Sequence, residues 1–152
     1  GRSKVPTIYD EATYEFEIGK GHVLKEGTDV TIVATGIMVQ EALEAREELV
    51  KEGIEAKVVD IHTIKPIDEE LLIKCAKETG AVVTAEEHNI MGGLGSAVAE
   101  VLVENHPVPM NRIGVQDTFG ESGSPDGLME KYGLTAKEII AAAKKVMDQK
   151  QK

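Results

Sequence analysis

The fold class of this chain is decided by the stretch Asp29-Val30-Thr31-Ile32-Val33-Ala34-Thr35-Gly36. Residues 30–34 are β-branched or small, and all are apolar except Thr31. A short run of this kind is typical of a parallel strand that is covered on both faces. Similar runs recur at residues 56–61 and 81–85, with a weaker one at 112–115.

Segments with helical spacing of apolar residues separate these runs. They cover residues 39–50, 68–80 and 97–102, then a short segment at 124–133 and a last one at 135–147. Asp68 is placed to cap the second segment and Gly80 to end it, and Thr135 with Glu138 forms a capping-box pattern. Strands that alternate with helices predict an α/β domain with a mainly parallel sheet and helices on both faces.

An additional strand is expected before the first parallel one, at residues 14–18 or 22–24. No helical crossover follows it, so we expect it to run antiparallel at or near an edge of the sheet. We therefore divide the chain into an N-terminal linker segment with an edge strand (1–27), the main domain (28–147) and a polar, frayed tail (148–152).

Composition narrows the possible classes of protein. The chain has 152 residues, of which 41% are hydrophobic, and a net charge of −10. This fits one globular domain and argues against disorder, a membrane span of about 20 apolar residues and the basic face of a nucleic-acid binder. Cys75 is the only cysteine, which excludes an internal disulfide and favours the cytoplasm. Because the chain opens at Gly1 without methionine, we expect either a removed tag or a piece of a longer chain.

Ligands of such sheets bind at the carboxyl ends of the strands, so the segments there are the candidates for function. The cluster Gly92-Gly93-Leu94-Gly95 has two interpretations, a phosphate cradle or a tight turn that lets a helix pack closely on the sheet. It lacks the lysine of a P-loop and the spacing of a dinucleotide fingerprint.

Single side chains at these strand ends give no complete active site. Glu87, His88, Phe119 and Glu121 are loop candidates, and His62 follows another strand. Neighbouring residues on a strand point to opposite faces, so we expect no metal site at Glu87 and His88. We assign no catalytic, metal-binding or cofactor-binding residue, and Cys75 on an apolar helical stripe predicts a buried, inert thiol.

Four motifs follow one another along nearly the whole chain. They are residues 29–36; Val58-Val59-Asp60-Ile61-His62-Thr63-Ile64-Lys65-Pro66-Ile67-Asp68; residues 82–88 with Gly92-Gly93-Leu94-Gly95-Ser96; and Phe119-Gly120-Glu121-Ser122-Gly123 with Tyr132-Gly133-Leu134-Thr135. In this order they resemble the C-terminal domain of transketolase and its thiamine-diphosphate relatives. The loop at 119–123 favours the transketolase branch.

This resemblance implies a three-layer α/β/α sandwich around a five-stranded mixed sheet with one antiparallel strand. It implies that thiamine diphosphate and magnesium are held by two other domains of a dimeric enzyme, and that this domain alone binds no cofactor. The complete transferase would move a two-carbon ketol unit between sugar phosphates. This domain would supply dimer contacts and a wall of the substrate channel, and we expect the chain alone to be inactive.

The resemblance also points to two residues for substrate phosphate. Arg2 lies in a segment that resembles the linker from which transketolases contribute a phosphate-binding arginine, and a guanidinium fork suits phosphate. His62 stands where the related deoxyxylulose-phosphate synthases have an arginine. Such a synthase is one alternative identity, and a 2-oxoacid dehydrogenase beta subunit that docks an acyltransferase is another. An independent nucleotide-binding protein, suggested by the glycine turn, is a third.

Overall fold

The computed structural model describes residues 19–89, 93–115 and 133–150. The elements follow in the order β1 (Gly21–Lys25), β2 (Val30–Ala34), α1 (Met38–Lys51), β3 (Ala56–Ile61), α2 (Glu69–Thr79), β4 (Val82–Asn89), α3 (Leu94–Asn105), β5 (Met110–Val115) and α5 (Ala136–Lys150). No helix in these ranges combines the length and apolar character that crossing a bilayer requires. The predicted helix at 124–133 and strand at 14–18 fall outside them, apart from Gly133.

The five strands form one sheet in the order β1-β3-β2-β4-β5. β1 pairs antiparallel with β3 at one edge, and the other neighbouring pairs are parallel. The predicted mixed sheet with an antiparallel edge strand is therefore confirmed. Of the two candidate positions for that strand, the described one is at residues 22–24, within β1.

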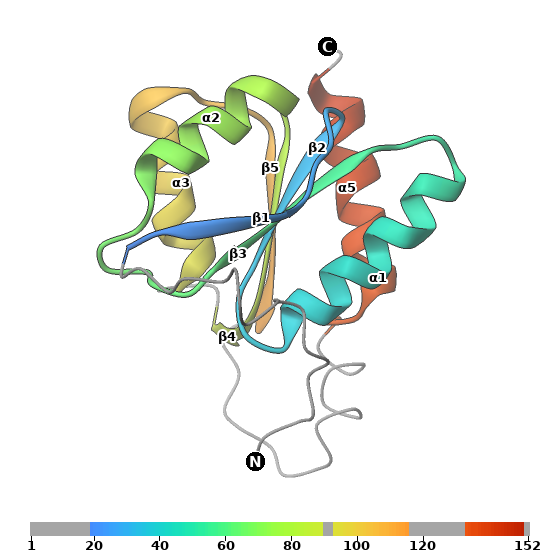
Figure 1. Cartoon of the computed structure of the whole chain (residues 1–152), viewed down its shortest axis with the longest axis horizontal. Coiled ribbons are helices and arrows are strands. Elements are labelled where there is room, and N and C mark those ends of the chain that lie inside the picture. Colours follow the sequence, from blue (N-terminus) through green and yellow to red (C-terminus); the bar gives the residue numbers. More distant parts are fainter. Residues whose placement is uncertain (1–18, 90–92, 116–132, 151–152) are drawn as a thin grey trace, which may run out of the picture.

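The helices cover the sheet in two layers (Figure 1), with α1 and α5 on one face and α2 and α3 on the other. Each face has its own apolar core. Even-numbered residues of β2, such as Ile32, face α1 and α5, and Val33 faces α2 and α3. The predicted three-layer sandwich is confirmed, and all residues of β2 and β3 are buried, as a strand covered on both sides requires.

The two residues predicted to cap and end α2, Asp68 and Gly80, do so in the structure. The Leu71 N–H donates to Asp68 Oδ1 at 3.2 Å, and Gly80 ends the helix with a φ of 73°. Cys75 lies on the buried side of this helix, in the core between α2 and the sheet. Burial raises the pKa of its thiol to about 11, so the thiol is protonated at neutral pH, in keeping with the predicted inert cysteine.

The C-terminal end of α5 differs from the expectation. The helix continues to Lys150, beyond residue 148 where we expected the chain to fray. The Lys150 ammonium donates to the carbonyl oxygens of Asp29 and Thr79, each at 2.6 Å. These long-range contacts hold a polar segment that local composition alone marks as a free end.

Candidate functional site at the carboxyl edge of the sheet

The carboxyl edge of the sheet contains a topological switch point. From β2 the chain crosses through α1 to β3, then returns through α2 to β4 on the other side of β2. A crevice between β2 and β4 is where ligands of doubly wound sheets bind. The segments that meet there are the turn at Thr35–Gly36, the end of β4 and the start of α3.

Glu86 closes one side of this crevice. Its side chain is 0% exposed, and its two carboxylate oxygens accept hydrogen bonds from the Leu94 N–H at 2.7 Å and the Gly95 N–H at 2.8 Å. A charged acceptor for the first N–H groups of a helix is favourable because these groups carry partial positive charge. The N–H groups that a phosphate would need at this turn are therefore bound by the chain's own carboxylate.

The glycine at position 95 supports the alternative interpretation of the cluster, close packing. A Cβ atom there would lie 2.8 Å from Arg112 Cδ and 3.0 Å from Thr84 Oγ1. Both distances are below ordinary van der Waals contact, so a side chain at this position would push against Arg112 and Thr84, and glycine favours the close approach of α3 to the sheet.

Glu87 has the same role on the opposite face. Its Oε1 accepts a hydrogen bond from the Ile37 N–H, at the start of α1, at 3.3 Å. The turn before this helix needs glycine, because Gly36 has a φ of +62° and a Cβ there would lie 2.4 Å from Glu87 Oε1. Adjacent residues of β4 thus cap two helices that lie on opposite faces of the sheet.

The remaining two helices also begin at carboxylates. The Ala136 N–H at the start of α5 donates to Glu41 Oε1 of α1 at 2.9 Å, and Asp68 caps α2 from within its own sequence. Each of the four helices in the described part of the chain therefore has a carboxylate at its N-terminus. This arrangement stabilises the helices and opposes the binding of another anion at the same N–H groups.

His62 is the predicted site residue that the structure places at this edge with part of its ring open to solvent. Its side chain is 31% exposed, and its Nε2 lies 3.3 Å from Oδ2 of the nearly buried Asp60. The ring of His22, from β1, meets it edge to face with a centroid distance of 5.7 Å. Asp60 and His22 together fix the orientation of the imidazole.

The other predicted site residues divide into two groups. Arg2, Phe119 and Glu121 lie outside the described ranges, as does the side chain of His88. Glu87 acts as a helix cap within the described structure. In the part of the chain that is described, no three His, Cys, Asp or Glu side chains gather in a group that could hold a metal ion.

Sequence reasoning missed the roles of Glu86, Asp60 and Glu41. A usable signal existed for Glu86, because the alternation along β4 places it on the α3 side, next to a glycine turn that opens a helix. No local signal exists for Glu41, whose backbone partner is 95 residues away.

The fold and this edge define a class of protein. It is a doubly wound, three-layer α/β domain in which the domain's own carboxylates cap the helix N-termini. The profile of the family described as "Transketolase, C-terminal domain" matches residues 19–139. The chain therefore belongs to the transketolase C-terminal domain family, and the resemblance seen in the motifs is confirmed.

Two curated relatives and one solved structure show the range of this similarity. The chain is 58% identical over 93% of its length to the "6-deoxy-6-sulfo-D-fructose transketolase subunit SqwH" of Clostridium sp. (strain MSTE9) and covers 44% of that protein. It is 46% identical over 95% of its length to the 1-deoxy-D-xylulose-5-phosphate synthase of Heliobacterium modesticaldum, covering 22% of it. A solved structure described as "Split gene transketolase, inactive beta4 tetramer" superposes with a TM-score of 0.93 at 58% identity, over 99% of this chain and 49% of the other.

The chain thus spans less than half the length of each of these relatives. The family and the fold are established by the match, and the activity of a complete protein is a separate question.

Proposed function

We propose that this chain is the C-terminal section of a transketolase and works together with the remaining part of the enzyme, which binds the cofactor. This companion polypeptide lies either in the same chain as further domains or in a separate subunit. The complete enzyme would transfer a two-carbon ketol unit between sugars that carry a terminal anionic group. The observation that carries this proposal is the family match over residues 19–139, which spans the entire sheet.

The described residues do not fit a thiamine diphosphate site of their own. A diphosphate needs free helix N–H groups, cationic side chains or a bound metal. Here the helix starts are occupied by Asp68, Glu86, Glu87 and Glu41. We therefore place thiamine diphosphate, which supplies the carbanion chemistry when bound, and its magnesium on the companion polypeptide.

The contribution we propose for this chain is recognition of the substrate's anionic end. His62 lies at the carboxyl edge, partly exposed, with Asp60 holding its ring in place. A protonated imidazole has two N–H donors, so one can donate to Asp60 and the other to a phosphate or sulfonate oxygen. Arg2 would be the second contact, from a segment that the described structure does not include.

Reconstitution tests the proposed function. We expect the chain alone to give no turnover with ketose donors, thiamine diphosphate and magnesium, and to give turnover when the companion polypeptide is added. Sedimentation of the chain alone measures whether it self-associates, as the split-gene relative does in its beta4 tetramer. Turnover by the isolated chain, or none in the reconstituted mixture, contradicts the proposal.

The two named relatives suggest which substrates to compare. We expect turnover with 6-deoxy-6-sulfo-D-fructose or with a phosphorylated ketose as the donor. The similarity to the Heliobacterium protein makes a synthase the second candidate. Formation of 1-deoxy-D-xylulose 5-phosphate by the reconstituted enzyme, with no ketol transfer, would select the synthase.

His62→Ala tests the anion contact. Loss of a hydrogen bond to a charged group predicts a rise of about tenfold in KM for donors with a terminal anion and little change for uncharged donors. We expect Arg2→Ala to give the same selective pattern. If the KM rises equally for donors with and without a terminal anion, the substituted residue does not bind the substrate's phosphate or sulfonate.

A further inference from the structure

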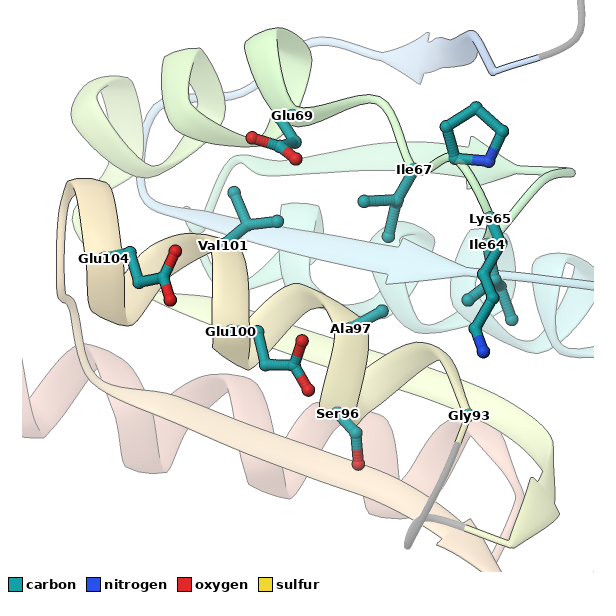
Figure 2. A pocket seen from close by; sticks show the side chains of 11 residues that line it. Ile64, Lys65, Ile67, Glu69, Gly93, Ser96, Ala97, Glu100, Val101 and Glu104 are labelled. Carbon is teal, nitrogen blue, oxygen red and sulfur yellow. The ribbon is translucent and has the colours of Figure 1, made fainter.

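A groove of about 440 Å³ lies between α2 and α3, on the face of the sheet opposite α1 and α5. Figure 2 shows that its walls come from the segment before α2, the start of α2 and one side of α3. Ile64, Ile67 and Val101 supply apolar surface. The groove reaches the carboxyl edge, because its lining includes Gly93 at the start of α3 and the two neighbours of the α2 cap Asp68.

Carboxylates reach this groove from both helices. Glu69 projects from α2, and Glu100 and Glu104 project from α3 (Figure 2). All three are exposed, and they form no hydrogen bond or ion pair with another residue in the described ranges. Among the described residues that line the groove, Lys65 is the one basic side chain. Like charges that share a concave surface repel one another, so the groove favours a cationic occupant.

Some acidic residues elsewhere in the described structure have a basic partner within the chain. Glu78 is paired with Lys57, and Glu52 with Lys144. The groove combines unpaired carboxylates with an apolar surface, which together match a peptide segment that bears both basic and apolar side chains.

We propose that this groove binds a segment of the companion polypeptide that carries lysine or arginine beside apolar side chains. The apolar side chains would cover Ile67 and Val101, and the cations would pair with Glu69, Glu100 and Glu104. This proposal rests on the proposed function, because that function supplies the partner.

Two charge-reversal variants with the same change in net charge test the groove. The first is Glu100→Lys/Glu104→Lys, in the groove. The matched control is Glu44→Lys/Glu47→Lys, two exposed residues of α1 on the opposite face of the sheet. Affinity for the companion polypeptide is measured at several salt concentrations, with circular dichroism and thermal melting of each variant to verify folding.

We expect the groove variant to weaken binding by about tenfold or more and the control by less than about twofold. Wild-type binding should weaken with added salt, and this dependence should be smaller for Glu100→Gln/Glu104→Gln, which keeps the side-chain shape.

Equal losses in both charge-reversal variants would overturn the proposal, because they would report only the net charge. A groove variant that changes self-association of the chain and leaves companion binding intact would also overturn it and make a second copy the occupant. If the wild-type chain gains turnover but the groove variant binds normally, only the groove proposal fails. If the wild-type chain gains no turnover, the proposed function fails and this inference falls with it.

Discussion

At the carboxyl edge of the sheet the helices begin, and their first N–H groups meet carboxylates such as Glu86 and Glu87. At the amino edge the helices end, and lysines lie there instead. Lys150 donates to the last carbonyl of α2, at Thr79, and Lys57 pairs with Glu78 near the same helix end. These charges follow the direction of the peptide dipoles, with carboxylates at the helix starts and lysines at the end of α2.

The difference between the edges shows how the chain uses its charge. Acids from the body of the domain bind its own helix starts, at the edge where related folds bind ligands. Part of the net charge of −10 therefore comes from acidic residues that bind helix starts, and not only from residues on the solvated surface. The comparison predicts that removing an acid at the carboxyl edge costs more than removing a base at the amino edge, because Glu86 is buried with both oxygens bonded.

The largest effect is expected for Glu86→Ala. It leaves two buried N–H groups at the start of α3 without an acceptor and opens a void, which should lower the free energy of unfolding by about 3 kcal/mol. Urea denaturation measures this change. Glu47→Ala on the surface of α1 is the control and should stay within about 0.5 kcal/mol. A similarly small change for Glu86→Ala would contradict the prediction that the carboxyl edge contributes more to stability than the amino edge.

A smaller loss is expected for Gly36→Ala. The positive φ and the close Glu87 oxygen together should cost about 2 kcal/mol. Gly53→Ala has a φ of +81° with open space around it, so backbone strain alone should cost about 1 kcal/mol. Adding Glu87→Ala to Gly36→Ala should reduce the excess over Gly53→Ala. An unchanged excess would show that the carboxylate does not determine the residue at position 36.

At the amino edge, Lys150→Met should cost about 1 kcal/mol, because it removes two hydrogen bonds to carbonyls but retains most of the aliphatic contact. Lys145→Met, at an exposed position of the same helix, should be nearly neutral. Thermal melting of the two variants measures the difference. If Lys150→Met lowers the stability as much as Glu86→Ala does, the two edges contribute equally to stability and the predicted difference is wrong.

The smallest effect should be the pH dependence of the pair between Lys57 and Glu78. The hydrogen bond from Lys57 lowers the pKa of Glu78 below its ordinary 4.5, so the pair stabilises the fold above that pH and less as the pH falls through the lowered pKa. Burial alone would lower the pKa of Lys57, but hydrogen bonds to Glu78 and Glu26 raise it above 10.5.

Wild type should therefore be more stable than Glu78→Gln at pH 7, and this difference should shrink as the pH falls below about 4.5. Urea denaturation across this range measures the difference. A difference that remains constant into strong acid would contradict the assignment of the pKa shift to this pair.

Local patterns predicted most of the fold. The mostly apolar, β-branched runs identified β2 and β3. The residue types at Asp68 and Gly80 identified the ends of α2, and the absence of a crossover placed β1 at an edge. These features depend on neighbouring residues, so they can be read in one short stretch.

The candidate site was less predictable because its contacts join distant segments. Glu87 bonds to a backbone group 50 residues away and Glu41 to one 95 residues away. Strand alternation indicated that Glu87 and His88 point to opposite faces, but not that Glu87 bonds to the start of α1. Lys150 was assigned to a frayed end because its carbonyl partners belong to other elements.

The position of α5 also has a consequence for synthesis on the ribosome. The central strand β2 pairs with β3 and β4, both of which are made after it. The core on one face of the sheet is completed only when Ile139, Ala143 and Val146 of α5 have been made. A nascent chain that stops before residue 136 therefore exposes the part of this apolar face that α1 does not cover, which makes it prone to aggregation and a substrate for chaperones.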